Sequence, residues 1–234
     1  MKLTIDKHIF EKFPGLTLGV VVIHGADNTK KLSEVADMLR AEEVNLRQRP
    51  DIEPVKEHPA IDVWRQAHRA FGNNPNRYAP SVEAVIKRVV KGGQLPAINT
   101  LVDLYNYSCL KYIVPVGGED LDTCVGDIEL TRATGNEEFT ALGEEQNDPP
   151  AEGEVIYKDQ VGVLRRRFNW REANRTKLTE KTKNAMIVIE GLFPKTAADI
   201  TSATTELEAA IKKYCGAETK TFLMSATTLH EIEL

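Results

Sequence analysis

The sequence predicts an α+β protein folded as one domain around a central sheet assembly. Helical patterns fill most of residues 29–112, and short β-rich runs between turn-forming residues fill most of residues 126–192. The chain has 234 residues, of which 41% are hydrophobic, so it is long enough to bury an ordinary core. Because no internal repeat or low-complexity tract divides it, we expect a single domain over residues 1–234.

One strand and four helices are expected in the first half of the chain. Residues 16–23 form a short apolar run that is typical of a buried strand. Residues 29–49 place apolar side chains at helical spacing among charges, which predicts an amphipathic helix. Two further helices are expected to start after Asp62 and Ser81, because both residue types are good N-caps. Residues 96–112 complete the set, with a proline in the first turn.

The second half of the chain is expected to be mainly sheet. Clusters of Gly, Asn, Asp and Pro separate its β-rich runs, and residues 144–154 form a polar loop. A helix over residues 196–214 follows, with Gly216 as its C-terminal stop. The expected strands cover residues 126–132, 153–159, 160–170, 184–192 and 220–226.

Composition excludes several classes of protein. A net charge of −5 and a pI near 5.7 argue against bulk electrostatic coating of nucleic acid, so any RNA contact must be local. No apolar run is long enough to span a bilayer. The three cysteines are widely spaced and form no CxxC pair, which favours a reducing cytoplasm over a disulfide framework. No HExxH, GxSxG or Walker motif is present, and no metal or organic cofactor is expected.

Asn99, Asp103 and Asn106 lie four and then three residues apart, which sets all three on one face of the predicted helix. Asn and Asp are poor helix formers, because their side chains compete for the backbone, so their presence calls for a reason. They form either a hydrogen-bonding wall of a pocket, or a solvated face or buried polar brace. Periodicity alone favours the second interpretation.

Gly117 and Gly118 stand directly before three acidic residues. Consecutive glycines let successive backbone N–H groups converge on a carboxylate or an oxyanion. A plain turn explains the same pair of residues.

Positive charge is concentrated in residues 165–183, which hold eight basic and two acidic residues and a local charge of +6. Phe168 and Trp170 lie among the arginines, and aromatic faces with guanidinium groups suit the stacking of an unpaired nucleotide and the binding of phosphate. The alternatives are a solvated charged hairpin, or arginines paired with acids inside the fold.

Seven segments between residues 63 and 194 resemble the B3/B4 domain of the phenylalanyl-tRNA synthetase beta subunit, and resemble freestanding proteins built on that domain more closely still. The most specific is the INTLVDLYNY helix, followed by a Pro turn and Asp-Leu. The resemblance implies a β-sandwich-like sheet core of unusual topology flanked by helices. The segments are WRQAHRAFG, SVEAVIKRVVKGG, LPAINTLVDLYNYSCLK, PVGGEDLD, GDIELTR, FNWREANRTKLTEKT and IVIEGLFP.

In the synthetases this domain hydrolyses wrongly formed tyrosyl-tRNA, so the resemblance implies an ester substrate. The family's pocket asparagine falls on Asn106 and its pocket glutamate on Glu190. Its pocket histidine falls on Gly117, and its glycine-rich loop is replaced by REANRT. The Thr-Glu-Ala-Ser stretch that completes the synthetase pocket is not clearly found. These departures indicate an altered specificity.

The predicted function is therefore that of a cytoplasmic trans-editing aminoacyl-tRNA deacylase, whose partner is aminoacyl-tRNA or its acceptor end. The alternative is a non-catalytic module that binds tRNA or an amino acid. An aminoacyl ester is already activated, so a positioned water and oriented donors can hydrolyse it. The expected catalytic residues are Glu190, Asn106, Gly117 and Gly118. The expected substrate-binding residues are Asn99, Asp103, Arg166, Arg167, Asn169, Trp170, Arg171 and Arg175.

Overall fold

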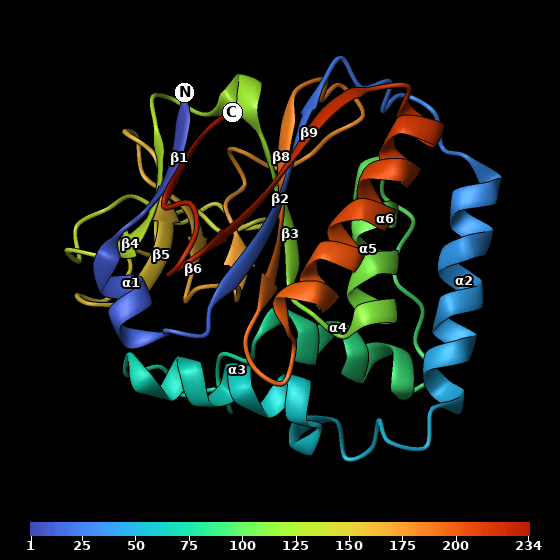
Figure 1. The fold of residues 1–234 in the computed structure, drawn as a ribbon, viewed down its shortest axis with the longest axis horizontal. Helices are drawn as coiled ribbons and strands as arrows, with labels where there is room; N and C mark the ends of the chain where they lie inside the picture. The colour runs from blue at the N-terminus through green and yellow to red at the C-terminus, as the bar shows by residue number, and fades with distance from the viewer.

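A computed structural model describes residues 1–234 of the protein. It contains two open sheets and six α-helices (Figure 1). The α+β prediction is confirmed. The helices are α1 (Lys7–Lys12), α2 (Ser33–Gln48), α3 (Pro59–Ala70), α4 (Ser81–Val90), α5 (Thr100–Tyr112) and α6 (Ala197–Cys215), with 3-10 turns η1 (Val55–Glu57) and η2 (Leu121–Thr123).

The smaller sheet has the strand order β3-β8-β2-β9, and all of its neighbours are antiparallel. The larger sheet has the order β10-β1-β4-β5-β6-β7, in which only β1 and β4 run parallel. Pairing of β1 with β10 brings the two termini together, as Figure 1 shows. The strands are β1 (Lys2–Ile5), β2 (Thr17–His24), β3 (Val116–Asp120), β4 (Ile128–Arg132), β5 (Val155–Lys158), β6 (Val163–Arg166), β7 (Arg171–Glu172), β8 (Ala185–Gly191), β9 (Glu218–Ser225) and β10 (Glu231–Glu233).

Strand β8 is buried on both faces, and its alternating side chains enter two different apolar cores. Met186 and Val188 join a cluster that also takes in side chains of the larger sheet, such as Leu130. Ile187 and Ile189 face the opposite way, into the cluster formed with α5 and α6. Figure 1 shows the resulting layers, with α5 and α6 on one side of the smaller sheet and the larger sheet on the other.

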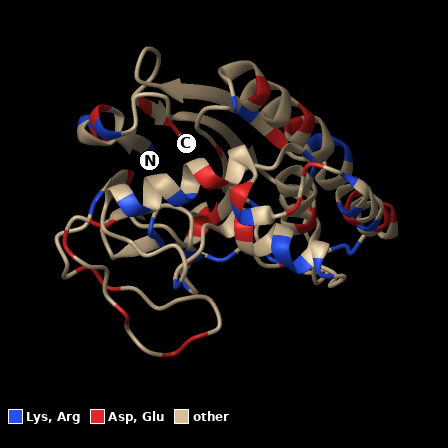
Figure 2. Cartoon of the chain, turned by 90° about the horizontal axis from the view of Figure 1, so that it is seen from below, with Lys and Arg blue, Asp and Glu red and all other residues tan.

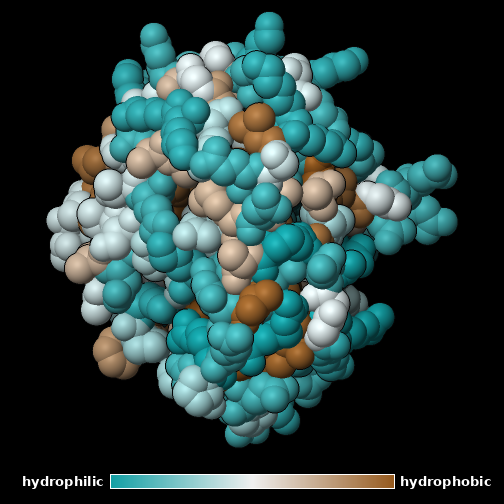
Figure 3. Space-filling model, turned by 90° about the vertical axis from the view of Figure 1, so that its right-hand side faces the viewer, coloured by the Kyte–Doolittle hydropathy of each residue, from teal (hydrophilic) through white to brown (hydrophobic).

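Helix α2 lies outermost, where its amphipathic pattern predicts an exposed face. Figure 3 shows the side of the molecule on which α2 lies, and that surface is mainly hydrophilic with scattered apolar atoms. None of the six helices is long and apolar enough to cross a membrane.

Three helix starts differ from the sequence prediction. Helix α3 begins at Pro59, and the His58 ring accepts from the Ala60 amide, so Asp62 lies in the first turn and is not the N-cap. Ser81 is the first residue of α4, and no side chain caps that helix. Helix α5 begins at Thr100, after its N-cap Asn99, because Asn99 Oδ1 accepts from the Val102 amide.

The sheet contains strands that the sequence pattern did not reveal. Both terminal strands, β1 and β10, are short and were not predicted. The glycine pair that reads as a turn lies in the edge strand β3. The predicted strand over residues 160–170 ends at Arg166, because Arg167 and Phe168 adopt left-handed conformations and turn the chain into β7.

Candidate active site

A cavity of about 350 Å³ opens between the edge strand β3, the second half of α5 and the turn that joins β6 to β7. It brings together six of the residues that were predicted to form the site. Four further lining residues carry polar groups and were not predicted, namely Ser81, Tyr105, Arg165 and Glu172. The six predicted residues are Asn106, Gly117, Asn169, Trp170, Arg171 and Glu190.

Glu190 lies at the floor of the cavity with an exposed fraction of 0%. Both of its carboxylate oxygens already accept hydrogen bonds. The Tyr157 hydroxyl donates to Oε1 at 2.8 Å, and Asn169 Nδ2 donates to Oε2 at 2.7 Å. Burial raises the pKa of Glu190, against the opposing effect of the Arg165 charge. Both carboxylate oxygens of Glu190 are therefore occupied by hydrogen bonds within the protein.

Arg165 supplies a guanidinium group to the same floor, and it is only 3% exposed. Its Nε donates to Glu119 Oε1 at 2.8 Å. Its Nη1 lies 3.8 Å from Glu190 Oε1, beyond hydrogen-bonding distance, and its Nη2 is buried without a partner. Arg165 thus brings N–H donors that have no acceptor in the protein to the wall of the cavity.

Two further carboxylates surround this guanidinium. Glu119 is fully enclosed, and burial raises its pKa to about 7 despite the nearby Arg165 charge. Glu172 Oε1 lies 4.0 Å from Arg165 Nε and accepts from the Gly118 amide at 3.1 Å. The Glu172 side chain is 20% exposed, and its Oε2 accepts no hydrogen bond from the protein. Burial raises its pKa as well.

Gly117 is required by the close approach of these side chains to β3. A Cβ at this position would lie 2.6 Å from Glu172 Oε1 and 2.7 Å from Arg165 Cζ. The family that the sequence resembles has a histidine at this position. In this protein the Arg165 and Glu172 side chains occupy the space beside the strand that a larger residue would need.

The expectation that the Gly117 and Gly118 amides hold an oxyanion is corrected at Gly118. Strand β3 is at the edge of its sheet, and the Gly118 amide donates to Glu172 Oε1, so it is not free for a ligand. A Cβ on Gly118 would contact Leu178 and Ile187, and Gly118 does not line the cavity. Arg165 provides the free donors instead.

The polar face of α5 divides into two parts. Asn106 lines the cavity, and its side chain makes no hydrogen bond to the protein. Asn99 caps the helix and donates to the Leu178 carbonyl, while Asp103 accepts from the Ile98 amide. For Asn99 and Asp103 the buried-brace interpretation therefore holds and the pocket assignment is wrong, because both side chains satisfy backbone groups at the start of the helix.

Several arginines of residues 165–183 are paired with acids inside the fold. Arg166 is buried and donates two hydrogen bonds to Glu154 and two to Asp148, one of them to its backbone carbonyl. Arg175 binds both oxygens of Asp159. The interpretation of these two arginines as phosphate ligands is therefore corrected, and the internal pairing that the sequence left open is what the fold contains.

The loop between β4 and β5, residues 133–154, supplies much of this compensation. It holds seven acidic residues and no basic ones. In Figure 2, acidic positions lie along the long loops at the lower left of the view. Arg171 lies in the cavity wall and pairs with Glu144 of this loop at 3.3 Å, where both side chains are exposed. Arg166 and Arg171 are thus paired with acids of a loop that precedes them by 12 or more residues, and a local count of charge does not show this.

The turn between β6 and β7 has a strained backbone, with φ of 48° at Arg167 and 66° at Phe168. Left-handed conformations of such residues cost of order 1–3 kcal/mol each and persist only when their surroundings enforce them. Phe168 is completely buried and packs edge-on against Trp64 and Phe13. Its burial fixes the turn, and the turn directs the next residue, Asn169, at Glu190.

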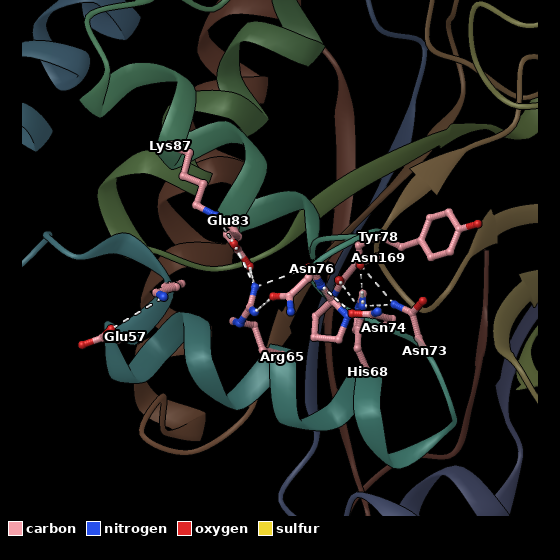
Figure 4. Close-up of polar contacts among 12 residues, drawn as sticks. Glu57, Arg65, His68, Asn73, Asn74, Asn76, Tyr78, Glu83, Lys87 and Asn169 are labelled. Atoms are coloured by element: carbon pink, nitrogen blue, oxygen red, sulfur yellow. Dashed lines mark hydrogen bonds and ion pairs between the residues drawn. The ribbon is translucent and has the colours of Figure 1, made fainter.

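A buried histidine, His68, contacts the Asn169 side chain, as Figure 4 shows. Asn169 Nδ2 faces Glu190, so its Oδ1 faces His68 Nε2, 3.2 Å away, and requires a donor there. The His68 proton is therefore on Nε2, and Nδ1 accepts from Asn73 Nδ2 at 2.7 Å. Burial lowers the pKa of His68 to about 4, which keeps the ring neutral. Sequence reasoning assigned this histidine no part in the site.

No group of three or more His, Cys, Asp or Glu side chains is arranged to hold a metal ion. The cavity contains Arg165 and Arg171 on the cationic side and Glu172 and Glu190 on the anionic side, with Asn106, Ser81 and Trp170 around them. A site of this kind suits a small polar group that carries both charge and hydrogen-bond acceptors.

The chain belongs to the B3/4 domain family, whose pattern matches residues 63–229. That match begins where the sequence resemblance begins, and it extends through α6 and β9.

The chain is similar to a crystal structure of an N-terminal fragment of the phenylalanyl-tRNA synthetase beta-subunit from Pyrococcus horikoshii, with 13% identity and a TM-score of 0.47. The match covers 93% of this chain and 49% of that one, so the chain spans about half the length of the fragment. No curated protein matches the sequence.

Proposed function

We propose that this protein hydrolyses the ester of a wrongly charged aminoacyl-tRNA, acting in trans, with the aminoacyl group bound in the cavity beside β3. Membership of the B3/4 family supports this reaction class. The observation that carries the proposal is the floor of the cavity, where Arg165 presents N–H donors without acceptors next to a partly exposed carboxylate, Glu172. An aminoacyl ester carries a carbonyl acceptor and an ammonium group on adjacent carbon atoms.

Size supports an aminoacyl group as the occupant. Pockets for small molecules range from roughly 300 to 1,000 Å³. At about 350 Å³ the cavity holds one amino-acid-sized group and part of its ribose, and it is too small for a folded nucleic acid. The rest of the acceptor end would lie outside the cavity.

The charge on the cavity floor favours a cationic group. Three carboxylates surround the single guanidinium of Arg165, and burial raises the pKa of each of them. An ammonium ion from the substrate would compensate this surplus of negative charge. We assign that contact to Glu172 Oε2, which has no partner in the protein, because both oxygens of Glu190 are already hydrogen-bonded.

Arg165 is then placed to bind the ester carbonyl and to stabilise the oxyanion that forms when water attacks it. Oriented donors in a water-poor site are the largest single contribution to many acyl-transfer reactions. Asn106, with a free side-chain amide on α5, would hold the attacking water or the ester oxygen.

In the reaction, water adds to the carbonyl carbon and the bond from that carbon to the ribose oxygen breaks. The ribose oxygen takes one proton and leaves as a hydroxyl, and the second proton passes to solvent as the amino acid departs as its carboxylate. No covalent enzyme intermediate is needed, because the ester is already activated.

A second candidate function is a module that binds the aminoacyl end without hydrolysing it. The absence of histidine and cysteine from the cavity wall favours this alternative, since these residues are common general bases and nucleophiles. In that case the same contacts would hold the substrate, and its ester would survive.

A deacylation screen separates the two. The pure protein is incubated with a panel of tRNAs that carry non-cognate amino acids, and the release of each amino acid is compared with the rate in buffer. We expect accelerated release from a subset of the panel. If the protein binds the charged tRNAs but accelerates the release of none of the amino acids, the protein is a binding module and not a hydrolase.

A further inference from the structure

A second cavity, of about 240 Å³, lies next to the first and shares the turn that joins β6 to β7. Arg167 contributes to its wall, whereas Asn169 and Trp170 of the same turn line the first cavity. Its other walls are the loop that follows α3, residues 71–78, and the segment that leads into β5.

Arg167 is a buried cation without an acceptor. Its guanidinium lies in the corner between two rings that contact each other edge-on, with its Cζ 3.7 Å from the centre of Tyr78 and 4.3 Å from the centre of Trp170. The residue is 9% exposed, its side chain donates no hydrogen bond, and its Nη1 is buried without a partner. Burial lowers the pKa of Arg167. A guanidinium held in this way lacks the compensation that buried charges ordinarily have.

The nearest carboxylate does not supply that compensation. Glu154 lies 3.7 Å from Arg167 Nε, beyond hydrogen-bonding distance. Both Glu154 oxygens instead accept from Arg166 at 2.9 Å, and one of them also accepts from the Arg167 amide. The cavity therefore has a cation at its wall and a carboxylate that is already neutralised.

A second guanidinium faces the same ring. Arg77 lies 5.0 Å from the centre of Tyr78, is exposed, and lines the second cavity. Two arginines on one aromatic ring, with no free acid between them, form a site for an anion, and guanidinium groups match the oxygens of a phosphate group well.

We propose that the second cavity binds one backbone phosphate of the tRNA acceptor end, with Arg167 and Arg77 as its ligands. This inference rests on the proposed function, because the ester and the phosphate are then neighbouring groups of one RNA end. The Trp170 ring supports the geometry, since it lines the first cavity and contacts the Arg167 guanidinium. The Trp170 ring thus contacts both sites.

The test uses the full chain and an uncharged RNA hairpin with a single-stranded 3′ end. We expect Arg167→Gln to weaken hairpin binding about tenfold, the loss typical of one charge-assisted hydrogen bond. The slope of log affinity against log salt should flatten by about 0.7 for the one phosphate released. Arg77→Gln, at an exposed position, should weaken binding in the same direction without a change in thermal unfolding. Lys220→Gln removes an equal charge from β9, outside both cavities, and should leave affinity and slope unchanged.

A hairpin with a neutral methylphosphonate at one 3′-terminal linkage identifies the phosphate. At the correct linkage, the methylphosphonate should weaken hairpin binding to the parent protein by the same factor as Arg167→Gln. It should cause no further loss of affinity in the Arg167→Gln variant. If a folded Arg167→Gln and Arg77→Gln both bind the ordinary hairpin with parental affinity and slope, the proposal is overturned. If inorganic phosphate binds in an Arg167-dependent way while hairpin affinity does not depend on Arg167, the ligand is a free anion and the RNA assignment is wrong.

Hydrolysis of a phosphate-free aminoacyl-adenosine by the parent protein reports on the proposed function alone. If this ester is stable but the hairpin binds in an Arg167-dependent way, the hydrolase proposal fails and the phosphate site stands. If the ester is hydrolysed and hairpin binding does not depend on either arginine, the hydrolase proposal stands and the phosphate site fails.

Discussion

Asn169 Nδ2 donates to Glu190 Oε2 at 2.7 Å, and this contact joins the strained turn between β6 and β7 to β8, an inner strand of the smaller sheet. Asn169 is itself fixed on two sides. Its Oδ1 faces His68, and its carbonyl accepts from the Ser81 amide at the start of α4. The cavity wall is therefore assembled from segments that lie far apart in the sequence, and Glu190 is the residue on which they meet.

The first prediction concerns Glu190→Gln. The new side-chain amide would face a donor, either the Tyr157 hydroxyl or Asn169 Nδ2, in a site closed to water. Loss of a buried, charge-assisted hydrogen bond costs about 1–3 kcal/mol. We expect the free energy of unfolding in urea to fall by that amount. Glu180→Gln, on the surface, is the control. Equal stability of Glu190→Gln and the parent protein would show that the carboxylate is not a structural anchor.

The second prediction concerns Gly117→Ala. Its Cβ would lie within 2.7 Å of both the Arg165 Cζ and the Glu172 Oε1 positions, so one or both side chains must move. Overpacking of this kind destabilises a protein by about 1–3 kcal/mol. We also expect ester hydrolysis to fall, because Arg165 and Glu172 are displaced. Gly15→Ala has no atom within 4 Å of the new Cβ and serves as the matched control. Parental activity in Gly117→Ala would rule out the assigned roles of these two side chains.

The third prediction is a pH dependence set by His68, whose pKa burial lowers from 6.5 to about 4. A depressed pKa means that the folded protein binds fewer protons than the unfolded chain, so this contribution to stability is present above pH 6.5 and is lost as pH falls toward 4. Between pH 7 and pH 5 the loss is about 2 kcal/mol. Urea unfolding at both values measures it.

His68→Gln removes the titrating ring and should reduce the difference in stability between pH 7 and pH 5 by that amount. His230→Gln, at an exposed histidine, should leave the difference as in the parent protein. If His68→Gln retains the full pH dependence, another group is responsible for it.

The fourth prediction concerns Glu172→Gln. Gln keeps an oxygen for the Gly118 amide but removes the charge that we assign to the substrate's ammonium group. We expect the kcat/KM for the best aminoacyl-tRNA ester to fall at least tenfold, which corresponds to about 1.4 kcal/mol. Thermal unfolding should change little, because the side chain is partly exposed. Glu144→Gln, at the partner of Arg171 on the rim, tests whether any nearby charge has the same effect. An equal loss in both variants would argue against a specific ammonium contact.

Local patterns predicted the helices and part of the site. Apolar spacing located α2 and α6, and helix periodicity with the family resemblance located Asn106 and Glu190. These features depend on residues that are close together in the sequence. Asn99 shows the limit of the same argument, because three polar residues on one helix face need not reach one cavity when the first of them caps the helix.

The remaining features depend on contacts that the sequence does not display. Gly117 reads as part of a turn until β8 pairs with β3 and the Arg165 side chain packs against it. The basic stretch reads as an RNA-binding surface until the loop between β4 and β5 supplies acids to Arg166 and Arg171. The importance of Arg165 arises from what it lacks, an acceptor for two of its nitrogens, and no linear pattern records that.

A crystal structure of the protein with a non-hydrolysable analogue would show the substrate contacts that we propose. The analogue is an adenosine whose 3′ oxygen is replaced by nitrogen so that it carries an aminoacyl amide. We predict the analogue in the cavity beside β3, with its ammonium within hydrogen-bonding distance of Glu172 and its carbonyl oxygen on an Nη atom of Arg165. An analogue bound outside this cavity, or bound in it with its carbonyl turned away from Arg165, would exclude the proposed roles of Arg165 and Glu172.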